Sequence, residues 1–332
     1  DTITPAFHRR LVNDHRPMVT ELAKRQVQSW PVGQVVQTYP WIASLTMAVI
    51  LRTVFTDGTP FQSELHHEML RMLEVAASLV LQQPHLRHLP GWHSTWRRFT
   101  ATRNRVNDLL AKVIRGRRAE PRGQGDLLEM LLQSCQASGT PLTDSELRDN
   151  LVSTIVAGHE TTASTLAWAV QLIAHHPQVQ DRLAEELDGG QDKYLAATIC
   201  EVIRHRPVFL FTPPRAVHRP IEIGGWTYHP PAHLLGCTYL MHHAPELFTN
   251  PRVFRPERFL DTPRLTAWLP WGGGKKVCPG RHLAMLELRI VLREILSTWR
   301  LTPASATIER PRWRSALVTP HAGASAILRP RS

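Results

Sequence analysis

The amino-acid sequence predicts a mainly α-helical fold with a small β portion, and three observations lead to this class. Hydrophobic residues make up 42% and charged residues 20% of the 332-residue chain, which is typical of a globular protein rather than a disordered one. Apolar residues recur at steps of three and four as far as about residue 206. Beyond that point, glycine and proline turns separate short alternating runs. No repeat or linker divides residues 1–332, so a single domain is predicted.

The longest predicted helix begins at a capping box. The Thr143 side chain can accept a hydrogen bond from the first turn, while Glu146 reaches back to the free amide of Thr143. Apolar or small residues then continue at helical spacing until the break before Pro177. At the usual rise per residue this helix is roughly 45–50 Å long, so it should cross the whole domain.

The remaining elements follow from periodicity and turn chemistry. Shorter helices are predicted at 177–187 and 192–205, and a last long helix at 281–299. Gly224 and Gly225 form a two-residue turn signal between two short strands, at 220–223 and 226–228. We expect further strands at 234–239, near Thr307 and at 316–318.

Charge and cysteine content exclude several classes of protein. The formal net charge is +11, but no run of Lys and Arg is dense enough for a nucleic-acid-binding arm. The longest largely apolar stretch, 41–51, is well short of the ~18 residues that a membrane span needs. Four widely spaced cysteines indicate a reducing, cytoplasmic setting. The chain opens with Asp1 and shows no secretory signal, and we expect that residues upstream are missing.

A glycine-rich loop before the last helix is the strongest candidate for chemistry. Three consecutive glycines, 272–274, let backbone amides turn toward one point, and Cys278 falls where the helix begins. The amides and the helix dipole would both favour a thiolate there. Such a sulfur suits a metal ligand, and thiolate ligation of haem iron pushes electron density onto the metal. The alternative is a buried cysteine behind a flexible loop.

Two further segments are weaker when each is taken alone. Residues 157–162 place a glycine and adjacent threonines inside the long helix, where the glycine costs about 1 kcal/mol relative to alanine. A functional groove would explain that cost, and a crossing of small residues with a solvated acid is the alternative. Glu201 and Arg204 lie three apart on one helical face, a pair worth only ~0.2–0.5 kcal/mol if exposed.

Together with the segment 254–259, these features resemble the cytochrome P450 family of haem-thiolate monooxygenases over nearly the whole chain. In that family the pattern aromatic-Gly-x-Gly-x-basic-x-Cys-x-Gly carries the cysteine ligand of the haem. The matching residues in this sequence are Trp271, Gly272, Gly274, Lys276, Cys278 and Gly280. Trp271 and Lys276 stand where the family most often has Phe and Arg or His. The family's first strands and first helices have no counterpart here, so the N-terminal part of the fold is expected to be missing.

The resemblance implies roles for individual residues. Glu160 would be the proton-relay acid and Thr161 the alcohol that passes protons on. Arg215 and Lys276 would each place a cation near a haem propionate. A buried network that stabilises the fold, without a catalytic role, would consist of Glu201, Arg204 and Arg258. The walls of the substrate pocket would include Ala157, Phe209, Leu210, Phe211, Leu317 and Val318.

The implied function is that of a haem b (iron protoporphyrin IX) monooxygenase, which inserts one oxygen atom of O2 into a small lipophilic substrate by hydroxylation or epoxidation. An acidic ferredoxin- or flavodoxin-type partner would deliver electrons to the basic face formed by Lys275, Lys276 and Arg281. Two alternatives stay open. A haem-thiolate isomerase or dehydratase would need no proton relay, and the intact Glu160-Thr161 pair argues against it. The other is a non-enzymatic haem-binding or sensor protein.

Overall fold

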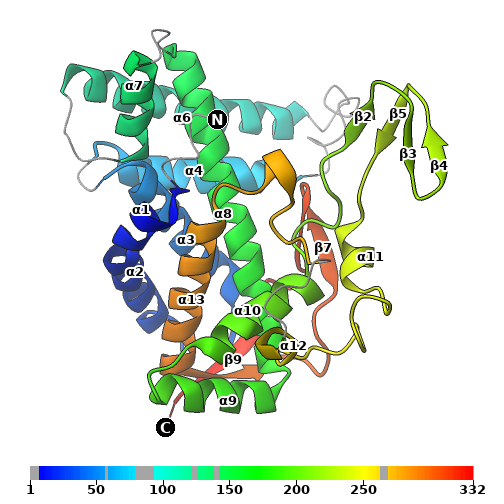
Figure 1. Cartoon of the computed structure of the whole chain (residues 1–332). Coiled ribbons are helices and arrows are strands. Elements are labelled where there is room, and N and C mark those ends of the chain that lie inside the picture. Colours follow the sequence, from blue (N-terminus) through cyan, green and yellow to red (C-terminus); the bar gives the residue numbers. More distant parts are fainter. Residues whose placement is uncertain are drawn as a thin grey trace.

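One long helix, α8 (Asp144–Ala174), runs through the middle of the molecule, and the other elements pack around it (Figure 1). The computed structural model describes residues 7–56, 59–78, 93–120, 126–137, 142–261 and 268–331. Within these ranges, helices form most of the structure and small antiparallel sheets lie to one side and at one end. The predicted class, mainly helical with a small β portion, is confirmed.

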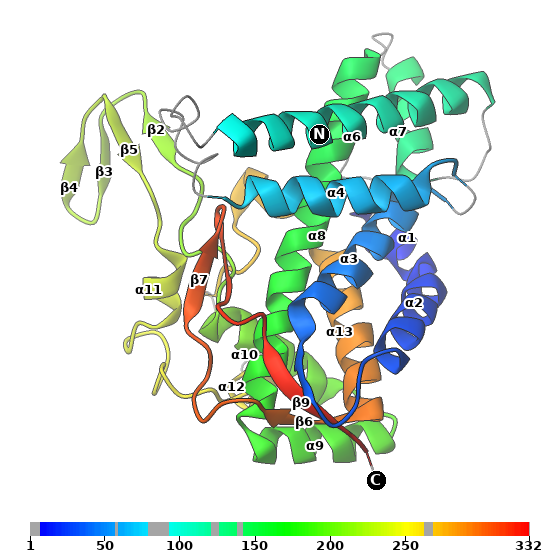
Figure 2. The same cartoon turned by 180° about the vertical axis from the view of Figure 1, so that it is seen from behind.

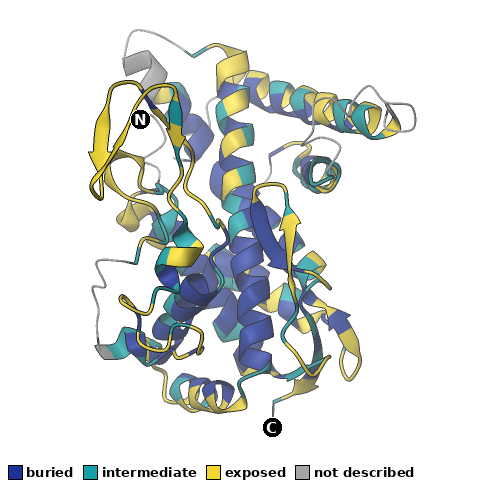
Figure 3. Ribbon diagram, turned by 90° about the vertical axis from the view of Figure 1, so that its right-hand side faces the viewer, coloured by how far each residue is buried: buried dark blue, intermediate teal, exposed yellow. Residues whose placement is uncertain are grey.

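The capping box predicted for α8 is present. Thr143 accepts a hydrogen bond from the backbone N–H of Glu146, and the Glu146 carboxylate accepts one from the N–H of Thr143 at 2.8 Å. In its first half the helix buries only one face, but from Thr162 to its end every residue is buried. Figure 3 shows this change along the central helix. The 157–162 segment therefore lies where α8 passes from half-exposed to fully enclosed.

Helices surround α8 on several sides. α3 (Thr38–Val54) crosses it closely, and α13 (Arg281–Thr298) lies beside it (Figures 1 and 2). None of the helices in the described ranges is long and apolar enough to cross a bilayer. The other α-helices within the described ranges are α1 (Arg9–Asp14), α2 (Arg16–Gln28), α4 (Gln62–Ala76), α6 (His93–Ala119), α7 (Leu127–Ala137), α9 (Pro177–Asp188), α10 (Lys193–His205), α11 (Thr238–His242) and α12 (Arg258–Asp261).

The strands pair as short antiparallel ladders. A three-stranded sheet of β1 (Val35–Gln37), β9 (Ser325–Pro330) and β6 (Trp299–Pro303) lies near the C-terminal end of α8. Three two-stranded ladders complete the β portion: β2 (Arg215–Val217) with β5 (Ala232–Leu234), β3 (Ile221–Ile223) with β4 (Trp226–Tyr228), and β7 (Pro311–Arg314) with β8 (Leu317–Pro320). The predicted hairpin at Gly224 and Gly225 is present, and both glycines have the positive φ that its tight turn requires.

Two predicted strands are wrong. Of the run 234–239, Leu234 ends β5, Cys237 forms an isolated bridge with Phe211, and α11 begins at Thr238. Stacking of the Tyr239 ring on His243, with 4.3 Å between the ring centroids, stabilises this helical turn. The strand expected near Thr307 is a bend, in which the Ser305 hydroxyl donates to the Thr307 carbonyl. The strand expected at 316–318 corresponds to β8, which begins one residue later and continues to Pro320.

A buried ionic network fastens α10 to the segment that leads into α12. Arg204 donates from Nε to Glu201 at 2.7 Å, and both side chains are fully buried. Arg258 donates to the same carboxylate at 3.1 Å. Two buried cations therefore share one anion, and their remaining hydrogen bonds go to backbone carbonyls, including that of His242 at 2.7 Å from Arg204 Nη1. The structure brings together the three side chains that the sequence placed in one network.

We predict that Glu201→Gln lowers the free energy of unfolding by about 3–5 kcal/mol, because it leaves two buried guanidinium groups without a counter-ion. Urea denaturation measures this loss. The exposed pair Arg300–Asp181 provides a matched control, and Asp181→Asn should cost under about 1 kcal/mol. A loss for Glu201→Gln as small as that for the control would contradict a structural role for the network.

Candidate functional site

The loop before α13 is a tight bend closed by one backbone hydrogen bond. Gly272 and Gly274 adopt φ values of +70° and +60°, which side chains on L-residues disfavour. The N–H of Cys278 then donates to the carbonyl of Trp271 at 2.8 Å. Gly280 has an ordinary φ and lies directly before the first residue of α13. The bend thus places the Cys278 thiol at the start of the helix, as the sequence indicated.

Two opposing effects act on the Cys278 thiol. Burial raises its pKa and is the larger effect, while hydrogen bonds from the backbone amides of Gly280 and Arg281, and the positive charge of Arg281, lower it. The amides therefore favour a thiolate as expected, but the sequence did not reveal how strongly the sulfur is desolvated. A bound metal cation would reverse the balance, because coordination deprotonates a thiol.

The middle of α8 carries the second candidate segment. Thr161 is partly exposed, and its hydroxyl donates to the Ala157 carbonyl at 2.7 Å. Ala157 is exposed, although the C-terminal half of the same helix is buried. Gly158 has a packing reason, since a Cβ atom there would come within 2.7 Å of Ile50 on α3. Close crossing of α3 and α8 thus explains the glycine, while Ala157 and Thr161 leave an accessible helical face.

Glu160 turns into the protein and pairs with a residue that sequence reasoning missed. Arg314, the last residue of β7, donates from Nε to the Glu160 carboxylate at 3.3 Å. Burial raises the pKa of Glu160, and Arg314 opposes that rise. Its neighbour His159 is also buried, with Nδ1 at 2.7 Å from the Thr46 hydroxyl, and burial lowers the pKa of His159 to about 3. The two contacts span more than a hundred residues of sequence, so no local pattern announces them.

The predicted pocket residues fall into two groups. Phe209 and Phe211 keep nearly half of their surface exposed, and Leu210 is partly buried. Leu317 and Val318 on β8 are buried. The backbone N–H of Val318 donates to the Val208 carbonyl at 3.0 Å, which joins β8 to the segment that carries the two phenylalanines. The structure therefore places the two groups on adjacent segments. Of these residues, the Phe209 and Phe211 side chains are the ones most accessible to a ligand.

The residues present fit a haem group. Cys278 offers a sulfur ligand supported by amide hydrogen bonds. Arg215 and Lys276 are exposed, and in the part of the chain that is described neither forms an ion pair, so both are available to carboxylate groups such as the propionates. Exposed phenylalanine rings at 209 and 211 offer apolar surface that a planar ligand would cover.

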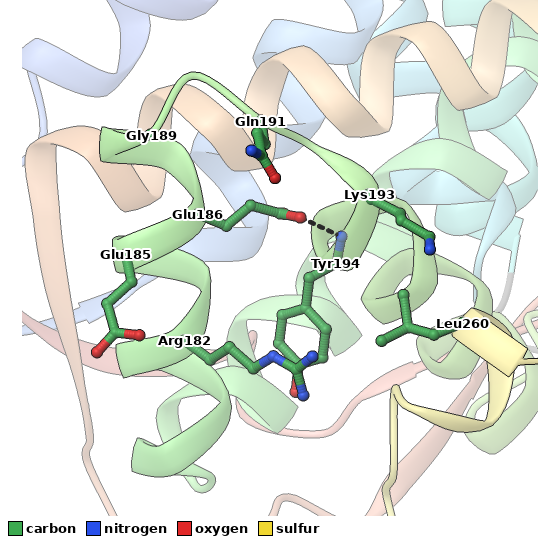
Figure 4. A pocket seen from close by; sticks show the side chains of 8 residues that line it. All are labelled: Arg182, Glu185, Glu186, Gly189, Gln191, Lys193, Tyr194 and Leu260. Atoms are coloured by element: carbon green, nitrogen blue, oxygen red, sulfur yellow. Dashed lines mark hydrogen bonds between the residues drawn. The ribbon is translucent and has the colours of Figure 1, made fainter.

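A surface pocket of about 430 Å³ lies elsewhere, between α9 and the start of α10 (Figure 4). Its polar groups contact one another. Glu186 accepts hydrogen bonds from the backbone N–H groups of Tyr194 and Leu195, and Arg182 lies over the Tyr194 ring. None of the predicted site residues lines this pocket. These contacts cap α10 and hold the loop before it.

Comparison with known proteins agrees with the geometry. A family model described as Cytochrome P450 matches residues 2–327. The chain belongs to the cytochrome P450 family. A protein named cytochrome P450 135B1 in Mycobacterium tuberculosis is 33% identical over 334 residues, covering 97% of this chain and 70% of that protein. Another from the same species, named cytochrome P450 137, is 32% identical and covers 99% of this chain and 70% of its own length.

Solved structures agree on the P450 fold. The haem domain of cytochrome P450DA superimposes with a TM-score of 0.86 at 24% identity, covering all of this chain and 76% of that domain. Membership of the P450 family implies a haem group, and the donor set around Cys278 is consistent with one.

We predict that Gly274→Ala weakens the bend that carries Cys278, because a side chain at φ +60° costs about 1–2 kcal/mol. Gly273→Ala is the matched control, since its φ of −155° suits any residue and neither position has a neighbour within 4 Å of a new Cβ atom. Hydrogen exchange of the Cys278 amide measures the opening of the bend. Equal exchange in the two variants would contradict the requirement for a left-handed residue.

Proposed function

We propose that this P450 is a haem-thiolate monooxygenase that inserts one oxygen atom of O2 into a small lipophilic substrate by hydroxylation or epoxidation. The observation that carries the proposal is the presentation of the Cys278 sulfur, held at the start of α13 by a closed glycine bend and aimed at by two backbone amides. Haem b is the cofactor that such a ligand suits.

The chain's own residues would hold the cofactor at three points. Cys278 would bind the iron, and the amides of Gly280 and Arg281 would stabilise the thiolate charge. Arg215 and Lys276 would each bind a propionate, Lys276 as a point charge without the forked geometry of arginine. Trp271 and Gly272 would shape the bend, since the Trp271 carbonyl accepts its closing hydrogen bond. When bound, a thiolate-ligated haem supplies an electron-rich iron that favours cleavage of the O–O bond.

Proton supply would fall to Glu160 and Thr161. Burial raises the pKa of Glu160, so a larger share of this carboxyl group keeps its proton as the pH approaches neutrality, which suits a general acid. The Thr161 hydroxyl donates to the Ala157 carbonyl, and no donor among the described residues bonds to its oxygen, so its lone pairs can accept. It can therefore take a proton from an acid and pass its own to a neighbour on the exposed face of α8.

An apolar substrate suits the surface that remains. Phe209, Phe211 and Ala157 are exposed, and Leu317 and Val318 are buried on β8, the strand that is joined at Val208 to the phenylalanine segment. These side chains offer an apolar wall with few polar groups, which selects by shape and size more than by hydrogen bonding. The substrate would bind between this apolar wall and the face of α8 that carries Ala157 and Thr161.

The first test follows the fate of oxygen in the haem-loaded protein, supplied with NAD(P)H and a ferredoxin reductase system. We predict a product that carries one atom from ¹⁸O2. Thr161→Ala should lower the yield of product per electron by at least about tenfold and release peroxide instead, because proton delivery fails. Thr165→Ala is the control, since Thr165 donates to the Thr161 carbonyl in the same way one turn further on. Product formed without uptake of O2 would favour an isomerase or dehydratase.

The electron donor would be an acidic ferredoxin- or flavodoxin-type protein. Lys275 and Lys276 are exposed in the bend, and Arg281 lies at the start of α13. We predict that the rate of reduction falls as salt rises, and that Lys275→Glu slows it further, because steering depends on unscreened charge. Lys193→Glu, at the exposed start of α10, serves as the control. A rate that is insensitive to both salt and Lys275→Glu would exclude this docking face.

A further inference from the structure

The hairpin formed by β7 and β8 contributes a cation, Arg314, that contacts the central helix α8. β7 and β8 lie alongside α8 in both views (Figures 1 and 2), with β8 packed against the helix. Arg314 ends β7, and the next residue, Ser315, turns the chain with a φ of +57°. The Arg314 guanidinium then bonds the Glu160 carboxylate, and the two side chains are only 24% and 9% exposed. A nearly buried ion pair thus joins the hairpin turn to the middle of α8.

The aromatic ring of Tyr39 makes a second contact with the Arg314 guanidinium. Tyr39 belongs to α3, and its ring centroid lies 5.5 Å from the Arg314 guanidinium carbon. Stacking against an aromatic face stabilises a cation and limits its movement. Arg314, at the end of β7, therefore contacts both the Glu160 carboxylate on α8 and the Tyr39 ring on α3.

The same hairpin is attached to α8 at a second point. The Trp168 indole N–H donates to the Val318 carbonyl at 3.0 Å, two helical turns beyond Glu160. Leu317 and Val318, which the proposed function places in the pocket wall, follow Arg314 by three and four residues. One short hairpin therefore carries both the proposed pocket-wall residues and the contact with Glu160.

We propose that Arg314 is a positioning residue for Glu160: it holds the carboxylate against the β7–β8 hairpin and so couples the placement of the proton-relay acid to the strand that walls the substrate pocket. This assignment rests on the proposed role of Glu160. It adds a residue from the C-terminal hairpin to the acid-alcohol pair on α8.

The charges around Glu160 are consistent with this role. Tyr39 from α3 has its pKa raised by burial and is neutral. His159 on α8, with His66 of α4 nearby, has its pKa lowered by burial to about 3, and that of His66 is lowered to about 4, so both are neutral at pH 7. Arg314 is thus the source of the positive charge that opposes the effect of burial on Glu160.

The test measures the protonation of Glu160 by infrared spectroscopy on the ferric, haem-loaded protein without substrate or reductant. The Glu160 band is identified as the carboxyl signal that Glu160→Gln removes. Removing the cation leaves burial unopposed, so Arg314→Gln should raise the pKa of Glu160 by about one unit or more. Arg314→Lys, which keeps the charge, should leave the midpoint close to that of the wild type.

Trp168→Phe is the control for the hairpin itself, because it removes the bond to Val318 without touching the ion pair. It should leave the Glu160 titration unchanged. An unshifted midpoint in Arg314→Gln overturns the proposal, as does an equal shift in Trp168→Phe, which would assign the effect to hairpin docking. If Arg314→Gln does not fold, a shift in Arg314→Lys as large as one unit overturns it equally. None of these outcomes depends on oxygen chemistry, so the proposed function is tested separately.

Discussion

The closed bend before α13 orients the Cys278 sulfur, and the proposed binding of a haem iron requires that orientation. One hydrogen bond, from the Cys278 amide to the Trp271 carbonyl, brings the chain back on itself within seven residues. Such a turn needs left-handed backbone at Gly272 and Gly274, and it leaves the following amides directed at the sulfur. Without that geometry, a cysteine at this position would be one buried thiol among others. With it, the thiol is oriented before any cofactor binds.

Buried glutamates in this P450 occur in three different electrostatic settings. Glu201 accepts hydrogen bonds from two arginine side chains and from the backbone N–H of Arg255, an arrangement that holds separate segments together. Glu160 faces one partly exposed arginine, so burial and charge nearly oppose one another. Glu287 on α13 is buried with no hydrogen-bond partner for its Oε1 atom among the described residues, and its pKa is raised well above the usual value. Of the three, Glu160 is the one whose raised pKa is opposed by a neighbouring cation, and a carboxyl group perturbed by both burial and a specific charge is a candidate for proton transfer.

Local chemistry made much of the fold predictable from the sequence. The capping box at Thr143, the Gly224-Gly225 turn and the prolines that end helices act within a few residues, and the structure places these elements where the sequence indicated. Failures came where local patterns compete: after Leu234 the side-chain stacking of Tyr239 on His243 favours a helix over the continued strand. Strand β1 was missed because its pairing with β9 joins segments nearly three hundred residues apart, and β6 and β9 pair across the intervening β7–β8 hairpin rather than through a local turn.

The candidate site likewise contains residues that local sequence patterns reveal and residues whose contacts join distant segments. Motif residues such as Cys278 and Thr161 could be named from sequence, because their neighbours lie within the same segment. Arg314 could not, since its contact with Glu160 spans 154 residues and the surrounding segment contains several other arginines. The balance of burial against hydrogen bonding at Cys278 was equally hidden, because it depends on packing.

The absorbance spectrum of the reduced, carbon monoxide-bound protein tests the central claim most directly. We expect a Soret band shifted far to the red in the haem-loaded wild type, the signature of an anionic sulfur ligand, and loss of that shift in Cys278→Ser. An unshifted band in the wild type, or the same shifted band in Cys278→Ser, would contradict the assignment of this sulfur as the ligand of the iron.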